Sequence, residues 1–138
     1  MSVAYLDSSA IAKLVYHEPG SEELATFLAT TTVVSSDVAI TEVLRSARRV
    51  AEGWTPRQFG DLIEQVMETM EDMVLIVVEM ATLVRAGMLE GPYLRSLDAI
   101  HVSTAKGIAA EVFVTYDERQ AAAARIAGLH TIAPGLPR

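Results

Sequence analysis

The sequence predicts an α/β fold, a three-layer α/β/α sandwich around a short parallel central sheet. Short apolar runs of strand length alternate with segments whose apolar residues recur at helical spacing. The first run, residues 3–6, lacks the apolar–polar alternation of a strand with one wet face, which indicates a strand covered on both sides. Helical segments between such strands favour right-handed crossovers, which place helices on both faces of the sheet.

The first elements of the chain bring an acid to the end of a strand. Residues 3–6 run directly into a helix predicted over 8–16, so Asp7 stands between the two. Ser21 is expected to cap a second helix, because a serine hydroxyl can accept a hydrogen bond from a backbone N–H at this position. The β-branched residues of 31–35 then predict a second strand.

Two long helices are predicted next. The first is capped by Ser36 or Asp37 and ends at Gly53. The second begins at Thr55, because a proline occupies the first helical position and Gln58 completes a capping box with the threonine. The apolar stripe of this second helix comprises Phe59, Leu62, Ile63, Val66, Met67 and Met70. This helix is an insertion in the otherwise regular alternation of strands and helices.

The rest of the chain continues the strand–helix alternation to its end. The predicted elements are a buried strand over 73–78, a short helix over 81–88, a helix from Ser96, a buried strand over 111–115, a helix ending at Ala127 and a short strand over 129–132. In the helix from Ser96, the residues expected to face inward are Leu97, Ile100, Thr104 and Ile108. With 138 residues and no linker or repeat, the chain is predicted to form one domain, residues 1–138.

Composition excludes several kinds of site. The chain has no cysteine, so disulfides and thiolate metal sites are excluded, and its three histidines show no zinc-ligand spacing. The net charge of −7 argues against a broad electrostatic grip on nucleic acid and suits a protein that gathers acids around a metal or has a basic partner. No signal peptide and no apolar run of membrane-spanning length is visible, so we expect a cytoplasmic protein.

Four acids are candidates for a metal site. Asp7 and Asp117 each follow a predicted strand, and open α/β sheets bind ligands beyond the carboxyl ends of their strands. Asp98 lies in the first turn of a helix and Glu42 on a helix flank, and the sequence pattern leaves open whether these two reach the same edge. Clustered carboxylates without cysteine or histidine suit Mg²⁺ or Mn²⁺, ions that orient phosphates and activate water.

Each of the four acids also has a purely structural interpretation. Asp7 can cap the helix that follows it, and Asp117 can form a helix cap together with Gln120. Asp98 can act as a favourable charge at the positive end of a helix dipole. Glu42 can pair with Arg45 on the surface of its helix. Local chemistry alone leaves these alternatives open.

Four stretches of the sequence resemble the PIN domain. They are 5–10 (YLDSSA), 41–45 (TEVLR), 94–101 (LRSLDAIH) and 114–119 (VTYDER). They span nearly the whole chain, and the chain length is similar to that of the toxin ribonucleases of VapBC-type toxin–antitoxin modules. The resemblance implies that Asp7, Glu42 and Asp98 are metal-site acids, and that the helix of Asp98 starts at the active edge. It implies the same of Asp117 less firmly, since the last acid varies most in position among PIN domains.

The resemblance also implies a function. The expected activity is that of an endoribonuclease dependent on Mg²⁺ or Mn²⁺, which hydrolyses RNA phosphodiester bonds as the toxin of a toxin–antitoxin pair. The alternative is a catalytically inactive PIN-like module that binds RNA or protein; loss of one of the four acids would favour it, and none is missing. A phospho-receiver domain fits less well, because it has a paired acid after the first strand and a lysine after a late one, which this chain lacks.

Partners follow from the same resemblance and from the apolar stripe. A toxin implies a cognate antitoxin, and the stripe of the helix from Thr55 could accept an amphipathic partner helix unless all of it lies in the core. The antitoxin is expected to end in a basic side chain that reaches the acids. We expect a homodimer in isolation and a hetero-oligomer with the antitoxin. His101, one turn after Asp98, is expected to be a packed or supporting residue rather than a catalytic one.

Overall fold

A five-stranded parallel sheet forms the middle layer of the molecule. The computed structural model describes residues 2–91 and 93–137, and within them the strand order is β3-β2-β1-β4-β5. The strands are β1 (Ser2–Leu6), β2 (Thr31–Ser36), β3 (Val74–Ile76), β4 (Val112–Val114) and β5 (Thr131–Ile132). All four strand pairs are parallel. The predicted α/β sandwich is confirmed.

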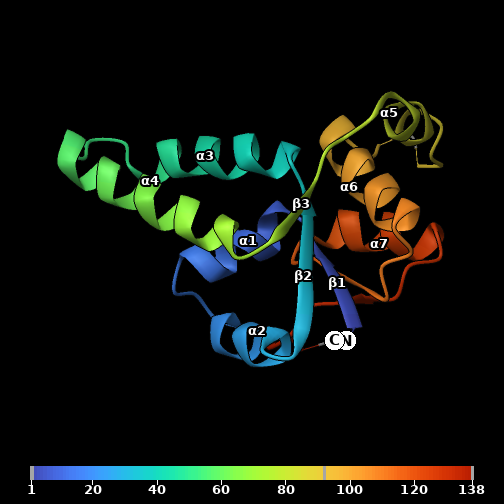
Figure 1. Cartoon of the computed structure of the whole chain (residues 1–138), viewed down its shortest axis with the longest axis horizontal. Helices are drawn as coiled ribbons and strands as arrows, with labels where there is room; N and C mark the ends of the chain where they lie inside the picture. Colours follow the sequence, from blue (N-terminus) through green and yellow to red (C-terminus); the bar gives the residue numbers. More distant parts are fainter. Residues whose placement is uncertain (1, 92, 138) are drawn as a thin grey trace.

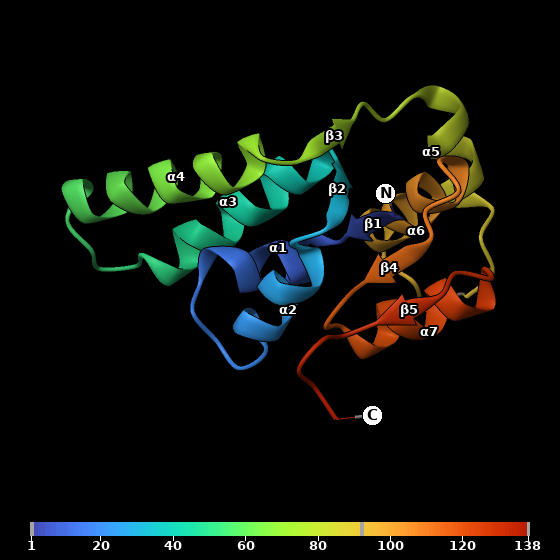
Figure 2. The same cartoon turned by 60° about the horizontal axis from the view of Figure 1, so that its bottom comes forward.

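Helices cover both faces of this sheet. The helices are α1 (Ser8–Val15), α2 (Ser21–Leu28), α3 (Val38–Val50), α4 (Pro56–Glu71), α5 (Met80–Gly87), α6 (Ser96–Gly107) and α7 (Glu118–Ile126). Figure 1 shows α1 to α4 on one side of the strands and α5 to α7 on the other. In Figure 2, α3 and α4 run side by side and extend beyond the sheet. None of the described helices is long and apolar enough to cross a membrane.

The central strand β1 supplies both halves of the core. Ala4 and Leu6 pack into the core on the side of α1 to α4. Tyr5, which points to the opposite face, packs with Phe113 of β4 and Val102 of α6. All three β1 side chains are fully buried, as predicted for a strand covered on both sides. Because β1 lies in the middle of the sheet, the residue that follows it is placed at the centre of the sheet's carboxyl edge.

The structure confirms the predicted cap of one helix and shows different caps at two others. The capping box of α4 is confirmed: Thr55 Oγ1 accepts a hydrogen bond from the Gln58 backbone at 3.2 Å, and Gln58 Oε1 accepts one from the Thr55 backbone at 2.9 Å. The prediction that Ser21 caps α2 is wrong, because the cap is Gly20 in a left-handed conformation. Asp37 stands at the cap of α3, but its carboxylate accepts from the Val78 N–H instead of from its own helix.

Two burial predictions are also wrong. The strand expected over 73–78 is shorter, Val74–Ile76, and Val74 is half exposed because β3 is an edge strand with one neighbour. Leu97 was expected to face inward but is 44% exposed. Thr104 is buried as predicted, and His101, which was not among the residues expected to face inward, is buried beside it. Most of the predicted α4 stripe does lie in the core, with Leu62, Val66 and Met70 buried.

Candidate active site

Asp7 and Asp117 meet at the carboxyl edge of the sheet because their strands are neighbours. Leu6 and Val114 are register partners, so the segments that leave β1 and β4 start side by side. Thr115 joins them: its Oγ1 donates a hydrogen bond to Asp7 Oδ2 and accepts one from the Asp117 N–H at 3.1 Å. The predicted convergence of these two strand-end acids is present in the structure.

Asp7 combines a structural role with its place in the acid cluster. Its side chain is nearly inaccessible, at 2% exposure. Oδ1 accepts hydrogen bonds from the Ala10 N–H at 3.0 Å, which caps α1, and from Ser9 Oγ at 2.6 Å. Burial raises the pKa of Asp7, and the hydrogen bonds from Ser9 and Thr115 oppose that rise. The cap and Ser9 occupy Oδ1, whereas Oδ2 accepts from the Thr115 hydroxyl and the Gln120 amide.

Asp98 reaches the same edge from the first turn of α6. Its pKa is raised, first by partial burial and then by the negative charges of Asp117 and Glu42. The geometric link is Gln120, whose side-chain amide reaches both Asp98 Oδ1 and Asp7 Oδ2. The position of Asp98, which local pattern left open, is therefore at the carboxyl edge of the sheet.

The side chain of Gln120 connects two of the acids, Asp98 and Asp7. It lies in the first turn of α7 and is 2% exposed. Its amide nitrogen faces the carboxylates, since these can only accept hydrogen bonds. In this orientation it donates to Asp98 Oδ1 at 2.8 Å and to Asp7 Oδ2 at 3.3 Å. Sequence reasoning considered Gln120 only as a capping partner of Asp117, and the backbone N–H of Gln120 does donate to Asp117 Oδ1 at 3.1 Å. Its side chain belongs to the acid cluster.

Glu42 enters from α3 and is held at both carboxylate oxygens. Ser8 Oγ donates to Glu42 Oε2 at 3.1 Å, and His101 Nε2 lies 2.5 Å from Glu42 Oε1. The other nitrogen of the imidazole, Nδ1, lies 2.6 Å from the hydroxyl of Tyr5. No ion pair with Arg45, the structural alternative for Glu42, is found among the described residues. His101 is completely buried, in the packed position that was predicted, and Tyr5 is a partner that the sequence analysis missed.

The comparisons with known proteins identify the family. A family model of the PIN domain matches residues 4–126. The chain belongs to the PIN domain family. Ribonuclease VapC46 of Mycobacterium tuberculosis (strain ATCC 25618 / H37Rv) is 37% identical over 137 residues, which cover 97% of this chain and 99% of that protein. Ribonuclease VapC47 of Mycobacterium tuberculosis (strain CDC 1551 / Oshkosh) is 33% identical over 138 residues, with 97% and 98% covered.

Solved structures confirm the PIN fold of the chain. VapBC2 from Rickettsia felis, bound to a promoter DNA fragment, matches with a TM-score of 0.73 at 14% identity over 96% of this chain and 98% of that one. FitAcB from Neisseria gonorrhoeae matches with a TM-score of 0.75 at 15% identity over 95% and 97%. At these identities the likeness concerns the fold alone.

The donor set of this PIN domain suits a divalent cation that prefers oxygen ligands. The acids that converge present carboxylate oxygens only, because His101 contacts Glu42 and not the centre of the cluster. Partial burial, and then the negative charges of Asp117 and Glu42, raise the pKa of Asp98, and a bound cation would oppose that rise. Within residues 2–91 and 93–137, no three acidic or histidine side chains are already grouped tightly enough to share one ion.

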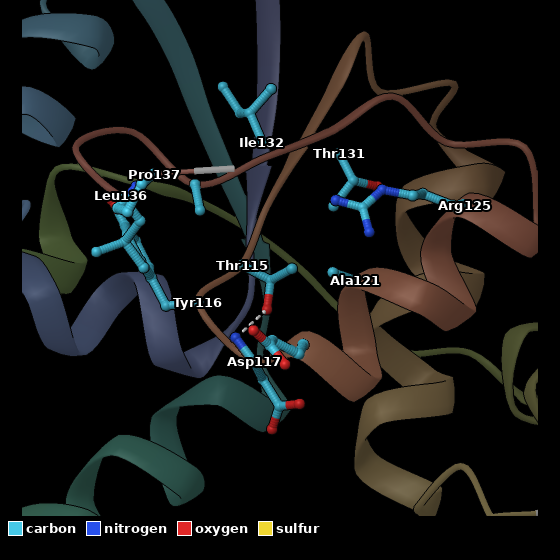
Figure 3. A pocket seen from close by; sticks show the side chains of 11 residues that line it. Thr115, Tyr116, Asp117, Ala121, Arg125, Thr131, Ile132, Leu136 and Pro137 are labelled. Atoms are coloured by element: carbon cyan, nitrogen blue, oxygen red, sulfur yellow. Dashed lines mark hydrogen bonds between the residues drawn. The ribbon is translucent and has the colours of Figure 1, made fainter.

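A pocket of about 490 Å³ opens beside Asp117 in this PIN domain (Figure 3). It is lined by the loop after β4, by α7, by β5 and by the C-terminal segment. The side chain of Arg125 also lines it, so the pocket has a positively charged side chain as well as the acid Asp117. This combination can accommodate an anionic group next to the carboxylates.

Proposed function

We propose that this PIN domain is an endoribonuclease that hydrolyses RNA phosphodiester bonds and acts as the toxin of a toxin–antitoxin pair. The proposal is supported by hydrogen bonds that connect four acids from four parts of the chain to one edge of the sheet, through Thr115, Gln120 and Ser8. These acids are Asp7, Glu42, Asp98 and Asp117. The relatives named as VapC ribonucleases, which match almost the whole chain, support the same activity. We take residues 1–138 as a single nuclease domain.

The proposed cofactor is Mg²⁺ or Mn²⁺ held by these four acids. Such an ion supplies positive charge to the scissile phosphate and activates water for in-line attack. The protein orients its acids through neighbours: Ser9 and Thr115 hold Asp7, and Gln120 ties Asp98 to it. Asp117 is anchored because its Oδ1 accepts from the N–H groups of Arg119 and Gln120. A second function, that of a catalytically inactive PIN-like module, has no observation in its favour.

The proposed protein partner is a small cognate antitoxin. The solved VapBC2 and FitAB structures are complexes bound to DNA, which supports a partnered state for chains of this fold. On α4, Met67 is 38% exposed while much of the apolar stripe is core, so only part of the stripe is open to a partner helix. A basic side chain of the antitoxin that reaches the acids would restrain the nuclease. We also propose a homodimer in isolation and a cytoplasmic site of action.

Cleavage of defined RNA by purified protein tests the proposed activity. The metal-free protein is expected to leave RNA intact, and added Mn²⁺ or Mg²⁺ is expected to start cleavage. Asp98→Asn should be inactive, while Asp61→Asn, which removes an exposed acid from α4, should cut like the wild type. Sequencing of cleavage products after induced expression would then identify the target RNA. Equal cleavage by wild type and Asp98→Asn would contradict the proposal.

A further inference from the structure

Three side chains from three separate elements form a continuous hydrogen-bonded line into the acid cluster. Tyr5 comes from β1, His101 from α6 and Glu42 from α3. The Tyr5 hydroxyl lies 2.6 Å from His101 Nδ1, and His101 Nε2 lies 2.5 Å from Glu42 Oε1. Tyr5 and His101 are completely buried, whereas the Glu42 side chain is 15% exposed. The line therefore begins in the core and ends at the accessible edge of the sheet.

The acceptor at the end of the line determines the direction of both hydrogen bonds. An ionised carboxylate can only accept, so the hydrogen between His101 and Glu42 belongs to Nε2. In the neutral imidazole Nδ1 is then an acceptor, and the Tyr5 hydroxyl donates to it. The opposite tautomer would set the Nε2 lone pair against the carboxylate at 2.5 Å, a repulsive contact. Only the Nε2–H tautomer satisfies both hydrogen bonds of the neutral ring.

Packing in the core holds the first member of the line in place. The Tyr5 ring is stacked on Phe113 at a centroid distance of 5.5 Å and meets the His101 ring edge-on at 5.7 Å. Because Tyr5 occupies the central strand, its hydroxyl cannot move without disturbing the core on that side. Tyr5 therefore fixes the orientation of the His101 imidazole. The other oxygen of the Glu42 carboxylate, Oε2, accepts a hydrogen bond from Ser8 Oγ at 3.1 Å.

We propose that Tyr5 and His101 are positioning residues that fix the direction of the Glu42 carboxylate before a metal ion arrives, with His101 donating to it from Nε2. This inference rests on the proposed function, since it assigns Glu42 to the metal site. Residues that hydrogen-bond to a metal ligand commonly fix its orientation. The loss of such a residue weakens metal binding by about 10- to 100-fold. If Tyr5 and His101 served only in packing, substituting them would lower the stability of the fold and leave its metal affinity unchanged.

Calorimetric titration of the metal-free protein with Mn²⁺ separates these two roles. His101→Leu is expected to weaken Mn²⁺ binding by about 10-fold or more. In His101→Gln the amide N–H can take the place of Nε2–H, so most of the affinity should return. Val66→Ala is the control, because it removes buried volume from the core on the other face of the sheet, away from the cluster that holds Tyr5; it should lower stability and keep Mn²⁺ affinity.

Tyr5→Phe and nuclear magnetic resonance provide a second arm that does not depend on His101 variants folding. The ring nitrogens of metal-free wild type should show a protonated Nε2 at His101, and Tyr5→Phe should weaken Mn²⁺ binding. An unprotonated Nε2, or undiminished Mn²⁺ binding by folded His101→Leu or Tyr5→Phe, would overturn the positioning role. Wild-type protein that binds no Mn²⁺ would instead refute the proposed metal-dependent function, and with it this role.

Discussion

Thr115 donates a hydrogen bond to Asp7 across the ends of two neighbouring parallel strands, although 108 positions separate the two residues in the sequence. The same hydroxyl oxygen accepts from the backbone N–H of Asp117. One buried threonine thus connects the two acids that follow β1 and β4, and three predictions concern this edge of the sheet directly.

Thr115→Val is expected to destabilise the fold by about 1–3 kcal/mol, because the change leaves a buried oxygen of Asp7 and the N–H of Asp117 without their partner. The side chain keeps its size, so lost packing contributes little. Urea unfolding measures the free energy of unfolding. Thr69→Val on the exposed surface of α4 is the control and should change it by less than about 0.5 kcal/mol. Equal stability of the two variants would mean that the hydroxyl of Thr115 is dispensable.

Addition of Mn²⁺ or Mg²⁺ to metal-free protein is expected to raise the melting temperature, since the ion relieves repulsion among the carboxylates of the folded state. A ligand at about 100 times its Kd adds about 2.7 kcal/mol of stability. Thermal melts with and without the ion measure the shift. Asp98→Asn should lose most of it, and the α4 variant Asp61→Asn should keep it. A shift of the same size in both variants would place the ion elsewhere.

Asp7→Asn and Asp98→Asn are expected to abolish RNA cleavage and to leave the protein folded. The pKa of Asp98 is raised in the folded state, so its ionised form is disfavoured there. The stability gained by protonating it is present at low pH and is lost as pH rises through the raised pKa. At neutral pH the uncharged asparagine should therefore make the metal-free protein at least as stable as the wild type. A lower melting temperature of metal-free Asp98→Asn would contradict this account of the repulsion.

Arg125→Ala is expected to raise KM for RNA with little change in kcat, because this cation borders the pocket beside Asp117 and lies outside the acid cluster. Steady-state cleavage of a short RNA measures both constants. Arg57→Ala removes the same charge from the start of α4 and should leave both unchanged. Equal effects of the two variants would reduce the role of Arg125 to that of net charge.

The proposed homodimer is expected to depend on α5, where the structure exposes more apolar surface than on α4. Met80 and Met88 are each 80% exposed and Val84 is 61% exposed, on a helix whose spacing puts them on one side. Light scattering at micromolar concentration should give twice the chain mass for the wild type and a lower mass for Val84→Glu. A wild-type monomer would refute the homodimer, and a dimeric Val84→Glu would exclude this face.

The sequence by itself determined the fold class, the order of the elements and the two acids at strand ends, because these depend on local patterns. An apolar run buried on both faces marks β1, a capping box marks the start of α4, and the residue after a strand in a parallel sheet lies at its carboxyl edge. The structure places Asp7 and Asp117 there as those patterns predicted.

Local patterns left open which helix flanks reach that edge; the family resemblance implied an answer, and the tertiary structure decided it. Asp98 and Glu42 arrive through the placement of α6 and α3, which depends on the packing of whole helices and not on the residues around each acid. The same holds for the inward side chain of Gln120 and for the line from Tyr5 to Glu42. Val74 is exposed because strand order leaves β3 at an edge, and strand order is set by the crossovers between elements far apart in the chain.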